Sequence, residues 1–371
     1  MFRPLYNSRL PVILFIVFLS IISTIVFTRH FHIAASPFTT LHSSGRVVFT
    51  AVNENFTRPL REPRVAKASM LYGPPNFLYE AAIESHARHN KLHGYEMYVS
   101  RTAITKGYWN KLLWLQHLMV TELQKPEGER LHWIMYVDPS IVLLNDRISL
   151  RTFLPPADPV FDSLALIATK PDGMTLSAAS FFLRISPTSL KILTAAMVAP
   201  KHVQSTDSST DLTSKTLQVI LEEEYKDAAI YQPVHWYNNA VSKKPSIHSD
   251  SLLVRFPHDL QGHRWKYMDN LLSVLSWNPQ SFSKKIEDTM YATEPQEFWM
   301  KVAEAREILE KAEEHLKSIP VIDDEEHKKS DSVEYLQTST RDLRLALESA
   351  AWDTDALERS LATVKGAMGL E

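Results

Sequence analysis

Apolar and polar positions in the first third of the ordered chain alternate between two periods. Short, mainly apolar runs with flanking turn residues are typical of strands, and the segments between them carry apolar residues at helical spacing. The predicted strands are 65–73, 95–100 and 131–138, and the predicted helices between them are 76–94 and 108–125. This order predicts an α/β fold with a mainly parallel central sheet. The third run is the most continuously apolar, so we expect it at the centre of the sheet.

Beyond residue 160 the pattern predicts further elements in a less regular order. The expected strands or extended pieces are 163–170, 176–186, 228–238 and 251–257, and the expected helices are 187–198, 211–226 and 262–275. Two long segments near the C-terminus, 296–317 and 335–367, are rich in Ala, Glu and Leu and predict a pair of helices. A helical cap on the domain and a partner-binding arm both fit these helices.

The N-terminal segment is strongly apolar. Residues 10–28 contain no charge, and at about 1.5 Å per residue a helix of this length reaches the short end of the range for a membrane span. We interpret it as an uncleaved signal anchor that follows a cytosolic tail at 1–9. A cleaved signal peptide is the alternative, with small residues at 34–36 as its cleavage site. The polar segment 29–63 then forms a stem, which carries a glycosylation sequon at Asn55.

Composition narrows the function classes. The chain is 44% hydrophobic and 22% charged, as expected for a globular protein, and its net charge of −3 gives no support for nucleic-acid binding. Cysteine is absent, which excludes disulfides and cysteine-based zinc sites.

The candidate chemistry begins at Asp138. It ends the strand that we expect to be the most buried. Ligands of open α/β sheets bind beyond the carboxyl ends of the strands. Pro139 stops the ladder and fixes the turn that presents the carboxylate. An ordinary strand-ending Asp that caps a turn explains the same pattern.

An ordered series of motifs around this position resembles the fungal glycosyltransferase family 34, which comprises Golgi α-1,2-galactosyltransferases and α-1,6-mannosyltransferase subunits. The series is ESHARHNKLHGYEMYV, YWNKLLWLQHLMVTEL, LHWIMYVDPSIVLLNDRISLRTFLPP, SFFLRIS, YQPVHWYN and LLVRFPHDLQGHRWKYM. The resemblance implies a GT-A-like nucleotide-sugar transferase domain at 64–290, and it leaves 291–371 as a helical extension. It also implies a single-pass type II Golgi membrane protein with a lumenal domain, a nucleotide-sugar donor, and a glycan or glycoprotein acceptor.

Matched position by position, the family's donor site is altered. The family's Asp-x-Asp, which helps to hold Mn²⁺ on the donor diphosphate, is Asp138-Pro139-Ser140 here, and the family's metal-binding His is Arg255. The family's small donor-pocket segment is 175–179, with Ser177 in its middle, and its acidic-Gln pair is 213–214, Thr-Ser. These changes disfavour Mn²⁺, because hard cations need oxygen anions and Arg cannot ligate a metal.

A cationic site is the alternative to a metal site. Arg255 binds phosphate bidentately if it faces the pocket, and Lys111, which matches the family's Tyr-Trp-x-Lys, adds a phosphate contact unless it is a surface lysine. His263 and Arg264 precede a helix and are further donor contacts. Trp236 and Tyr237 either stack against a sugar or are core aromatics. His89 and His93 have the spacing of a metal pair, but a structural role is the simpler interpretation.

Two functions follow. The first is a Golgi hexosyltransferase that uses UDP-galactose or GDP-mannose with a degenerate Asp-x-Asp motif. The second is a catalytically inactive paralogue that acts as a subunit of a hetero-oligomer with other Golgi glycosyltransferases, with the long helices as its docking surface. The sequence names no catalytic nucleophile for the first.

Overall fold

The computed structural model describes residues 62–105, 109–199, 209–241, 250–258, 263–319 and 331–370. The predicted anchor at 10–28, nearly all of the predicted stem and Asn55 lie outside the described residues. Within the described part of the chain, no helix is both long enough and apolar enough to cross a membrane. Contacts divide the chain into residues 1–57 and residues 58–371, and every described residue belongs to the second unit.

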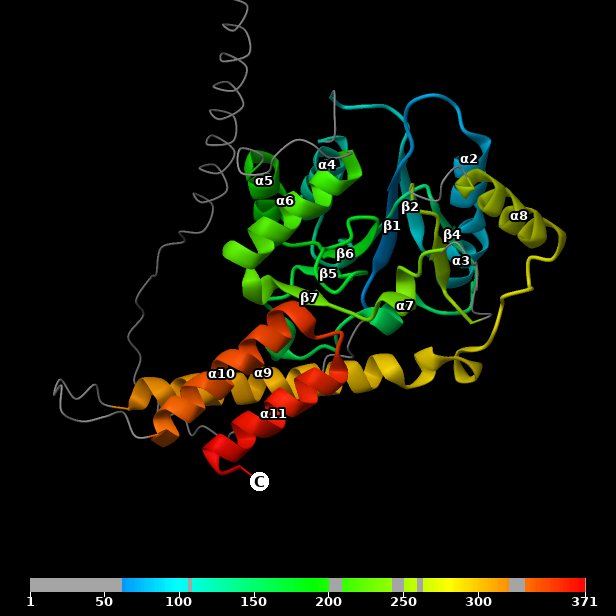
Figure 1. The fold of residues 1–371 in the computed structure, drawn as a ribbon. Helices are drawn as coiled ribbons and strands as arrows, with labels where there is room; N and C mark the ends of the chain where they lie inside the picture. The colour runs from blue at the N-terminus through cyan, green and yellow to red at the C-terminus, as the bar shows by residue number, and fades with distance from the viewer. Residues whose placement is uncertain are drawn as a thin grey trace, which may run out of the picture. The chain divides into compact units, whose positions relative to one another are not determined.

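A six-stranded sheet forms the centre of this unit (Figure 1). Its strands, in spatial order, are β2 (Glu96–Ser100), β1 (Val65–Met70), β3 (Trp133–Val137), β6 (Ser180–Arg184), β5 (Leu166–Ala168) and β7 (Ala229–Tyr231). Parallel pairing joins β1 to β2 and β3, and β5 to β7, whereas β6 runs antiparallel to both of its neighbours. Five strands therefore share one direction, which confirms the predicted mainly parallel sheet. All five residues of β3 are buried, as expected for an inner strand.

Helices cover one face of the sheet. α4 (Asn110–Leu123), α5 (Pro187–Val198) and α6 (Ser209–Glu223) lie together on this side (Figure 1). Because side chains alternate along a strand, Ile134 and Tyr136 of β3 face these helices, while Trp133, Met135 and Val137 face the opposite core.

A smaller unit packs beside the sheet. It pairs β4 (Ile141–Leu143) with β8 (Leu253–Arg255) in antiparallel fashion, and both pack against α2 (Phe77–Ser85) and α8 (Arg264–Trp277). α3 (Ala87–His93) follows α2 directly. The sequence predicts one helix over 76–94, but the structure breaks it at His86. There the backbone N–H donates to the Ile83 carbonyl, three residues back, so the turn tightens before α3 begins.

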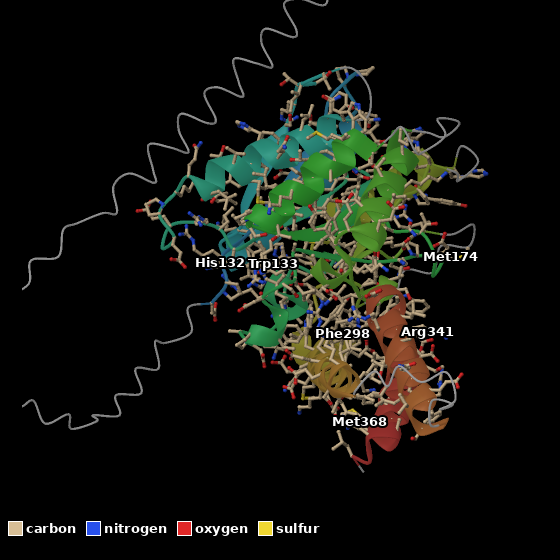
Figure 2. The ribbon with its side chains drawn as sticks, turned by 90° about the vertical axis from the view of Figure 1, so that its left-hand side faces the viewer. His132, Trp133, Met174, Phe298, Arg341 and Met368 are labelled. Atoms are coloured by element: carbon tan, nitrogen blue, oxygen red, sulfur yellow. The ribbon has the colours of Figure 1, made fainter. Side chains whose placement is uncertain are left out.

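Three helices form the C-terminal region: α9 (Glu294–Ser318), α10 (Asp331–Ala350) and α11 (Thr354–Met368). Figure 2 labels Phe298, Arg341 and Met368 on them. The prediction of a single helix over 335–367 is wrong, because Asp353 interrupts it. The Asp353 side chain accepts from the Ala356 N–H at 2.9 Å and so caps a new helix.

The C-terminal helices complete the core on the face of the sheet opposite to α4, α5 and α6. The rings of Phe161 and Trp299 meet edge to face at 5.0 Å, and Phe298 meets Trp236 at 5.4 Å. Short elements link these helices to the sheet: η1 (Leu150–Phe153), η2 (Pro159–Phe161), η4 (Lys226–Ala228), α7 (Val234–Tyr237), η5 (Ile286–Asp288) and η6 (Met290–Ala292). The helices thus act as a cap on the domain, as the first of the two interpretations expects.

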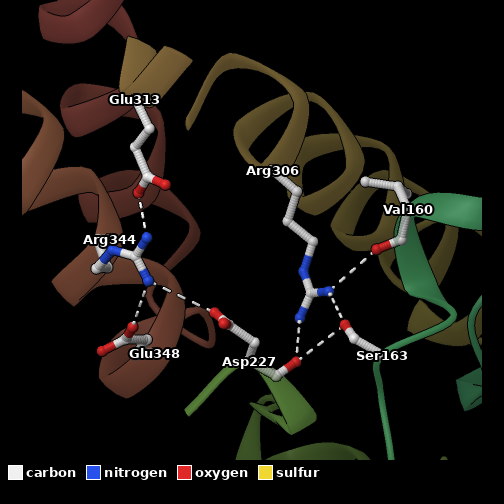
Figure 3. Close-up of polar contacts among 7 residues, drawn as sticks. All are labelled: Val160, Ser163, Asp227, Arg306, Glu313, Arg344 and Glu348. Carbon is white, nitrogen blue, oxygen red and sulfur yellow. Dashed lines mark hydrogen bonds and ion pairs between the residues drawn. The ribbon is translucent and has the colours of Figure 1, made fainter. Parts of the chain in front are cut away.

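Two arginines fasten this cap through polar contacts (Figure 3). Arg306 of α9 donates to the Val160 carbonyl at 3.0 Å, to Ser163 Oγ at 3.1 Å and to the Asp227 carbonyl at 3.3 Å. Arg344 of α10 pairs with the Asp227 carboxylate at 3.6 Å and also contacts Glu313 and Glu348. Asp227 therefore contacts α9 through its backbone carbonyl and α10 through its carboxylate.

Candidate functional site

Asp138 lies where β3 ends, at the carboxyl edge of the sheet. Its backbone N–H donates to the Ala179 carbonyl at 2.8 Å, which continues the pairing of β3 with β6 by one residue. Its Oδ1 accepts from the Tyr136 hydroxyl at 2.9 Å and lies 2.9 Å from the Lys111 ammonium. The carboxylate is 16% exposed, so it faces an opening.

Lys111 reaches this carboxylate from the first turn of α4. The Asn110 side chain fixes that turn, since its Oδ1 accepts from the N–H groups of Ile104 and Thr105. The ammonium also donates to the Ala178 carbonyl at 2.8 Å and stands 4.5 Å above the Tyr136 ring. Three groups, the Asp138 carboxylate, the Ala178 carbonyl and the Tyr136 ring, therefore surround this half-buried positive charge.

The electrostatics of Tyr136 suit its place beneath the ion pair. Burial, followed by the charge of Asp138, raises the pKa of the Tyr136 phenol well above its ordinary value. The phenol therefore stays protonated and donates to the carboxylate. The sequence offered a signal for this residue, because positions 136 and 138 share one side of the strand.

Ser140 and Arg255 meet through strand pairing. The turn at Pro139 leads directly into β4, whose Ile141 pairs with Arg255 of β8, and the Phe256 N–H donates to the Ser140 carbonyl at 3.0 Å. A pocket of about 190 Å³ opens at this junction. Its lining is Met70, Tyr72, Tyr79, Lys111, Tyr136, Asp138, Pro139, Ser140, Ala179, Thr213, Arg255, Phe256, Pro257, His258 and Arg264.

Arg264 is the third cation of the pocket. It is the first residue of α8 and is buried, with its guanidinium 4.8 Å from the Trp265 ring centre and 5.3 Å from that of Tyr79. One of its terminal nitrogens lies 3.0 Å from His258 Nδ1. Burial raises the pKa of Tyr79, opposed by Arg264, while the charge of Asp138 raises it further.

These side chains do not fit a divalent metal. Among the described residues that line the pocket, Asp138 carries the only carboxylate, and it is already paired with Lys111. Within the described residues, no group of three or more His, Cys, Asp or Glu side chains is placed to hold a metal ion. A hard cation would have to displace an ammonium and then approach two guanidinium groups, which is electrostatically unfavourable.

Two of the expected donor-site residues lie outside the pocket lining. The Ser177 hydroxyl is turned toward its own loop, where it accepts from the Ala179 N–H at 3.4 Å. His263 is exposed and tilts against Tyr267, with ring centres 5.9 Å apart. The altered pair at 213–214 does lie at the pocket. Thr213 lines it, and Ser214 Oγ accepts from the N–H of Ala178, the residue before the lining residue Ala179, at 3.2 Å.

Trp236 and Tyr237 need a correction, because both rings are buried in the core. Trp236 is 1% exposed, donates from Nε1 to Glu294 at 2.9 Å and packs against Phe153. Tyr237 is fully buried between Phe153 and Phe182. Neither ring has an open face on which a sugar could stack.

His89 and His93 are structural, as the simpler interpretation expected. His89 Nε2 lies 2.8 Å from the Ile148 carbonyl, and His93 Nε2 lies 2.9 Å from the Asp146 carbonyl. Both rings therefore hold the backbone that follows β4.

Comparison with known proteins identifies no family. No protein-family model and no curated protein matches the chain. Among solved structures, one partial likeness is to a glycosyltransferase involved in the glycosylation of the major capsid of PBCV-1, at 13% identity and a TM-score of 0.45, over 56% of this chain and 100% of that chain. Another is to a mutant Drosophila galactosyltransferase 7 in complex with manganese, UDP-Gal and xylobiose, at 14% identity and a TM-score of 0.21, over 34% of this chain and 51% of that chain. Because both TM-scores lie below 0.5, these likenesses carry no inference about function.

Proposed function

We propose that the chain is a glycosyltransferase with a GT-A-like domain, which transfers a hexose from UDP-galactose or GDP-mannose to a glycan or glycoprotein acceptor. One observation carries the proposal: Asp138, Lys111 and Arg255 come from separate elements and converge on one pocket at the carboxyl edge of the sheet. This edge is where open α/β sheets bind nucleotides.

The charges of the pocket suit a diphosphate. Three cations, Lys111, Arg255 and Arg264, and one carboxylate, Asp138, are among the described residues that line the pocket. Guanidinium groups bind phosphate oxygens bidentately, and an ammonium adds a point charge. We assign the diphosphate to these three side chains and donor hydroxyl groups to Asp138 and Ser140.

The same cations would assist the reaction. Negative charge builds up on the diphosphate as the bond to the sugar breaks, and fixed cations in a half-buried pocket stabilise that charge without a metal ion. Retention of anomeric configuration is implied by the family resemblance alone. We assign the role of nucleophile to none of the described residues that line the pocket.

A transfer assay tests this proposal. The full-length chain is incubated with labelled UDP-galactose or GDP-mannose, with and without an added glycan acceptor, in EDTA or in Mn²⁺. We expect sugar release or transfer in EDTA. Activity that strictly requires Mn²⁺ would contradict the role given to the cations, and inactivity toward all donors would favour the second function.

The second function is an inactive paralogue that serves as a subunit of a Golgi glycosyltransferase complex. The Lys111–Asp138 ion pair at 2.9 Å and the pocket volume of about 190 Å³ favour it. Sites for drug-sized ligands usually measure roughly 300–1,000 Å³. Copurification with an active transferase, together with no binding of either nucleotide sugar, would support this function over the first.

We also propose a single-pass type II Golgi membrane location, with the catalytic domain in the lumen. The uncharged segment 10–28 supports it as the anchor, and the sequon at Asn55 supports a lumenal stem. Protease digestion of sealed membranes tests the topology. Protection of residues beyond 63, together with a mobility shift on glycosidase treatment that Asn55→Gln removes, is the expected result, and cleavage without detergent is the contrary one.

A further inference from the structure

One lysine of the central sheet is completely buried. Lys67 sits in the middle of β1 with 0% exposure, and its ammonium nitrogen is 2.7 Å from His89 Nδ1 and 3.1 Å from His86 Nδ1. Within the described part of the chain, none of the ion pairs includes Lys67. Buried lysines are normally paired with a carboxylate, so two imidazoles as partners call for an explanation.

Hydrogen-bond geometry fixes the protons of this cluster. His89 Nε2 faces the Ile148 carbonyl at 2.8 Å, and a carbonyl can only accept, so Nε2 carries the proton. The unprotonated Nδ1 therefore faces Lys67, whose amine must be the donor. His86 presents its Nδ1 to the same nitrogen. An extra proton on either Nδ1 would turn an acceptor into a donor and place two positive charges about 3 Å apart.

The closed cluster resists protonation. Burial, followed by the charge of Lys67, lowers the pKa of His86 well below its ordinary value and that of His89 to about 2. Burial also lowers the pKa of Lys67 well below its ordinary value. In water an imidazole has a pKa near 6.5, so a solvated cluster would take up protons that the closed cluster excludes.

The histidines also hold the strand that continues from the pocket. His89 contacts the Ile148 carbonyl and His93 the Asp146 carbonyl, while Ser85 Oγ accepts from the Leu143 N–H at 2.9 Å. The backbone of Ile141 lies against His86. The segment 141–148 begins directly after Ser140, which lines the pocket, so α2 and α3 hold the chain that adjoins the pocket wall.

Other charged or titratable groups surround the cluster. They are His93 on α3, Tyr95 after it, Asp146 with its ion-pair partner Arg88, and Arg151 of η1. Asp146 lies in contact with Arg88 and Ser283 rather than with Lys67. The carboxylate among these neighbours, that of Asp146, is therefore already paired with Arg88 and is not a partner that could compensate a second proton on the cluster.

We propose that Lys67, His86 and His89 form a proton-sensitive clamp, which holds β4 and the adjoining pocket wall near neutral pH and releases them on acidification. The sign follows from linkage. Each histidine binds a proton more weakly in the closed state than in the open state, so its contribution to the stability of the clamp is fully present well above pH 6.5 and is lost as the pH falls below that value. Between pH 7 and 5, each histidine shifts the opening equilibrium by up to about 25-fold.

Hydrogen–deuterium exchange on the full-length chain tests the clamp. After correction for the intrinsic exchange rate, protection of the peptide 137–148 should fall between pH 7 and 5, by up to about 25-fold for each histidine. The double variant His86→Gln, His89→Gln keeps polar groups but cannot titrate, so its protection should depend little on pH. The variant His117→Gln removes an exposed histidine of α4 and is the matched control, which should behave as the wild type.

Two results would overturn the proposal: unchanged protection of 137–148 in the wild type, or an equal fall in the double variant. If the double variant does not fold, imidazole nitrogen NMR of the wild type decides. The signals of His86 and His89 should remain those of neutral Nε2–H rings while the segment stays protected. Titration of either ring near pH 6.5, without loss of protection, would contradict the clamp.

Discussion

At the scale of single residues, the site is built around one ion pair whose surroundings the sequence reveals only in part. Asp138 could be predicted, because an apolar strand followed by Pro places a carboxylate at the sheet edge. The presence of Arg255 in the same pocket was indicated by the family resemblance alone and not by periodicity, since it depends on the pairing of Ile141 with Arg255 across two distant segments. The burial of Lys67 could not be predicted either, because a lysine within a strand is normally exposed and only the fold shows that this one is buried.

Lys111→Met tests the residue-scale account. The substitution keeps the length and apolar stem of the side chain but removes the charge that neighbours Asp138. Loss of a charge-assisted hydrogen bond is worth about 1.5–3 kcal/mol, so we expect binding of UDP or GDP to weaken by at least about 10-fold. Calorimetric titration measures the change. Lys191→Met, at an exposed lysine of α5, is the control, and equal affinities in both variants would contradict the role of Lys111.

At the scale of elements, periodicity located most helices and strands but not their interruptions. The break at His86 and the cap at Asp353 divide two predicted helices, because local hydrogen bonds there compete with helix continuation. Amphipathic spacing also could not distinguish sugar-stacking aromatics from core aromatics at Trp236 and Tyr237. That distinction depends on Phe298 of α9, which lies far along the chain.

Tyr291→Phe tests how the C-terminal region holds the pocket-bearing strand. The Tyr291 hydroxyl accepts from the Leu252 N–H at 3.0 Å and donates to the Trp236 carbonyl at 2.9 Å. Removing it leaves two buried backbone groups without this partner, so the free energy of unfolding should fall by about 1–3 kcal/mol. Urea denaturation monitored by tryptophan fluorescence measures it. Tyr335→Phe, at an exposed tyrosine, should leave stability within about 0.5 kcal/mol, and an equally small effect at position 291 would refute this link.

At the scale of the whole described unit, the C-terminal helices belong to the fold and are not an appended arm. Val302, Leu343 and Leu357, one from each helix, are fully buried in the same core as Met135 and Phe182 of the sheet. Composition predicted that these segments are helical. It could not show where they pack, because an amphipathic face fits a partner as well as the protein's own sheet.

Truncation after residue 290 should therefore prevent stable folding. The sheet would expose the core that α9, α10 and α11 cover, and apolar burial of this extent exceeds the roughly 5–15 kcal/mol that separates folded from unfolded domains. We expect aggregation, or loss of near-ultraviolet circular dichroism and of a cooperative thermal transition. Removal of residues 369–371 only, which follow α11, is the control and should leave the transition unchanged. A cooperatively folded 1–290 chain would show that the helices are dispensable for the fold.

The central claim is that the pocket at the carboxyl edge of the sheet binds a nucleotide diphosphate through Lys111, Arg255 and Arg264, without a metal ion. Calorimetric titration of the full-length chain with UDP-galactose and GDP-mannose in EDTA, repeated with Mn²⁺, tests it most directly. The account predicts saturable binding of one donor in EDTA, with affinity lost in Arg255→Met and retained in Lys191→Met. Binding that appears only with Mn²⁺, or no binding under either condition, would contradict it.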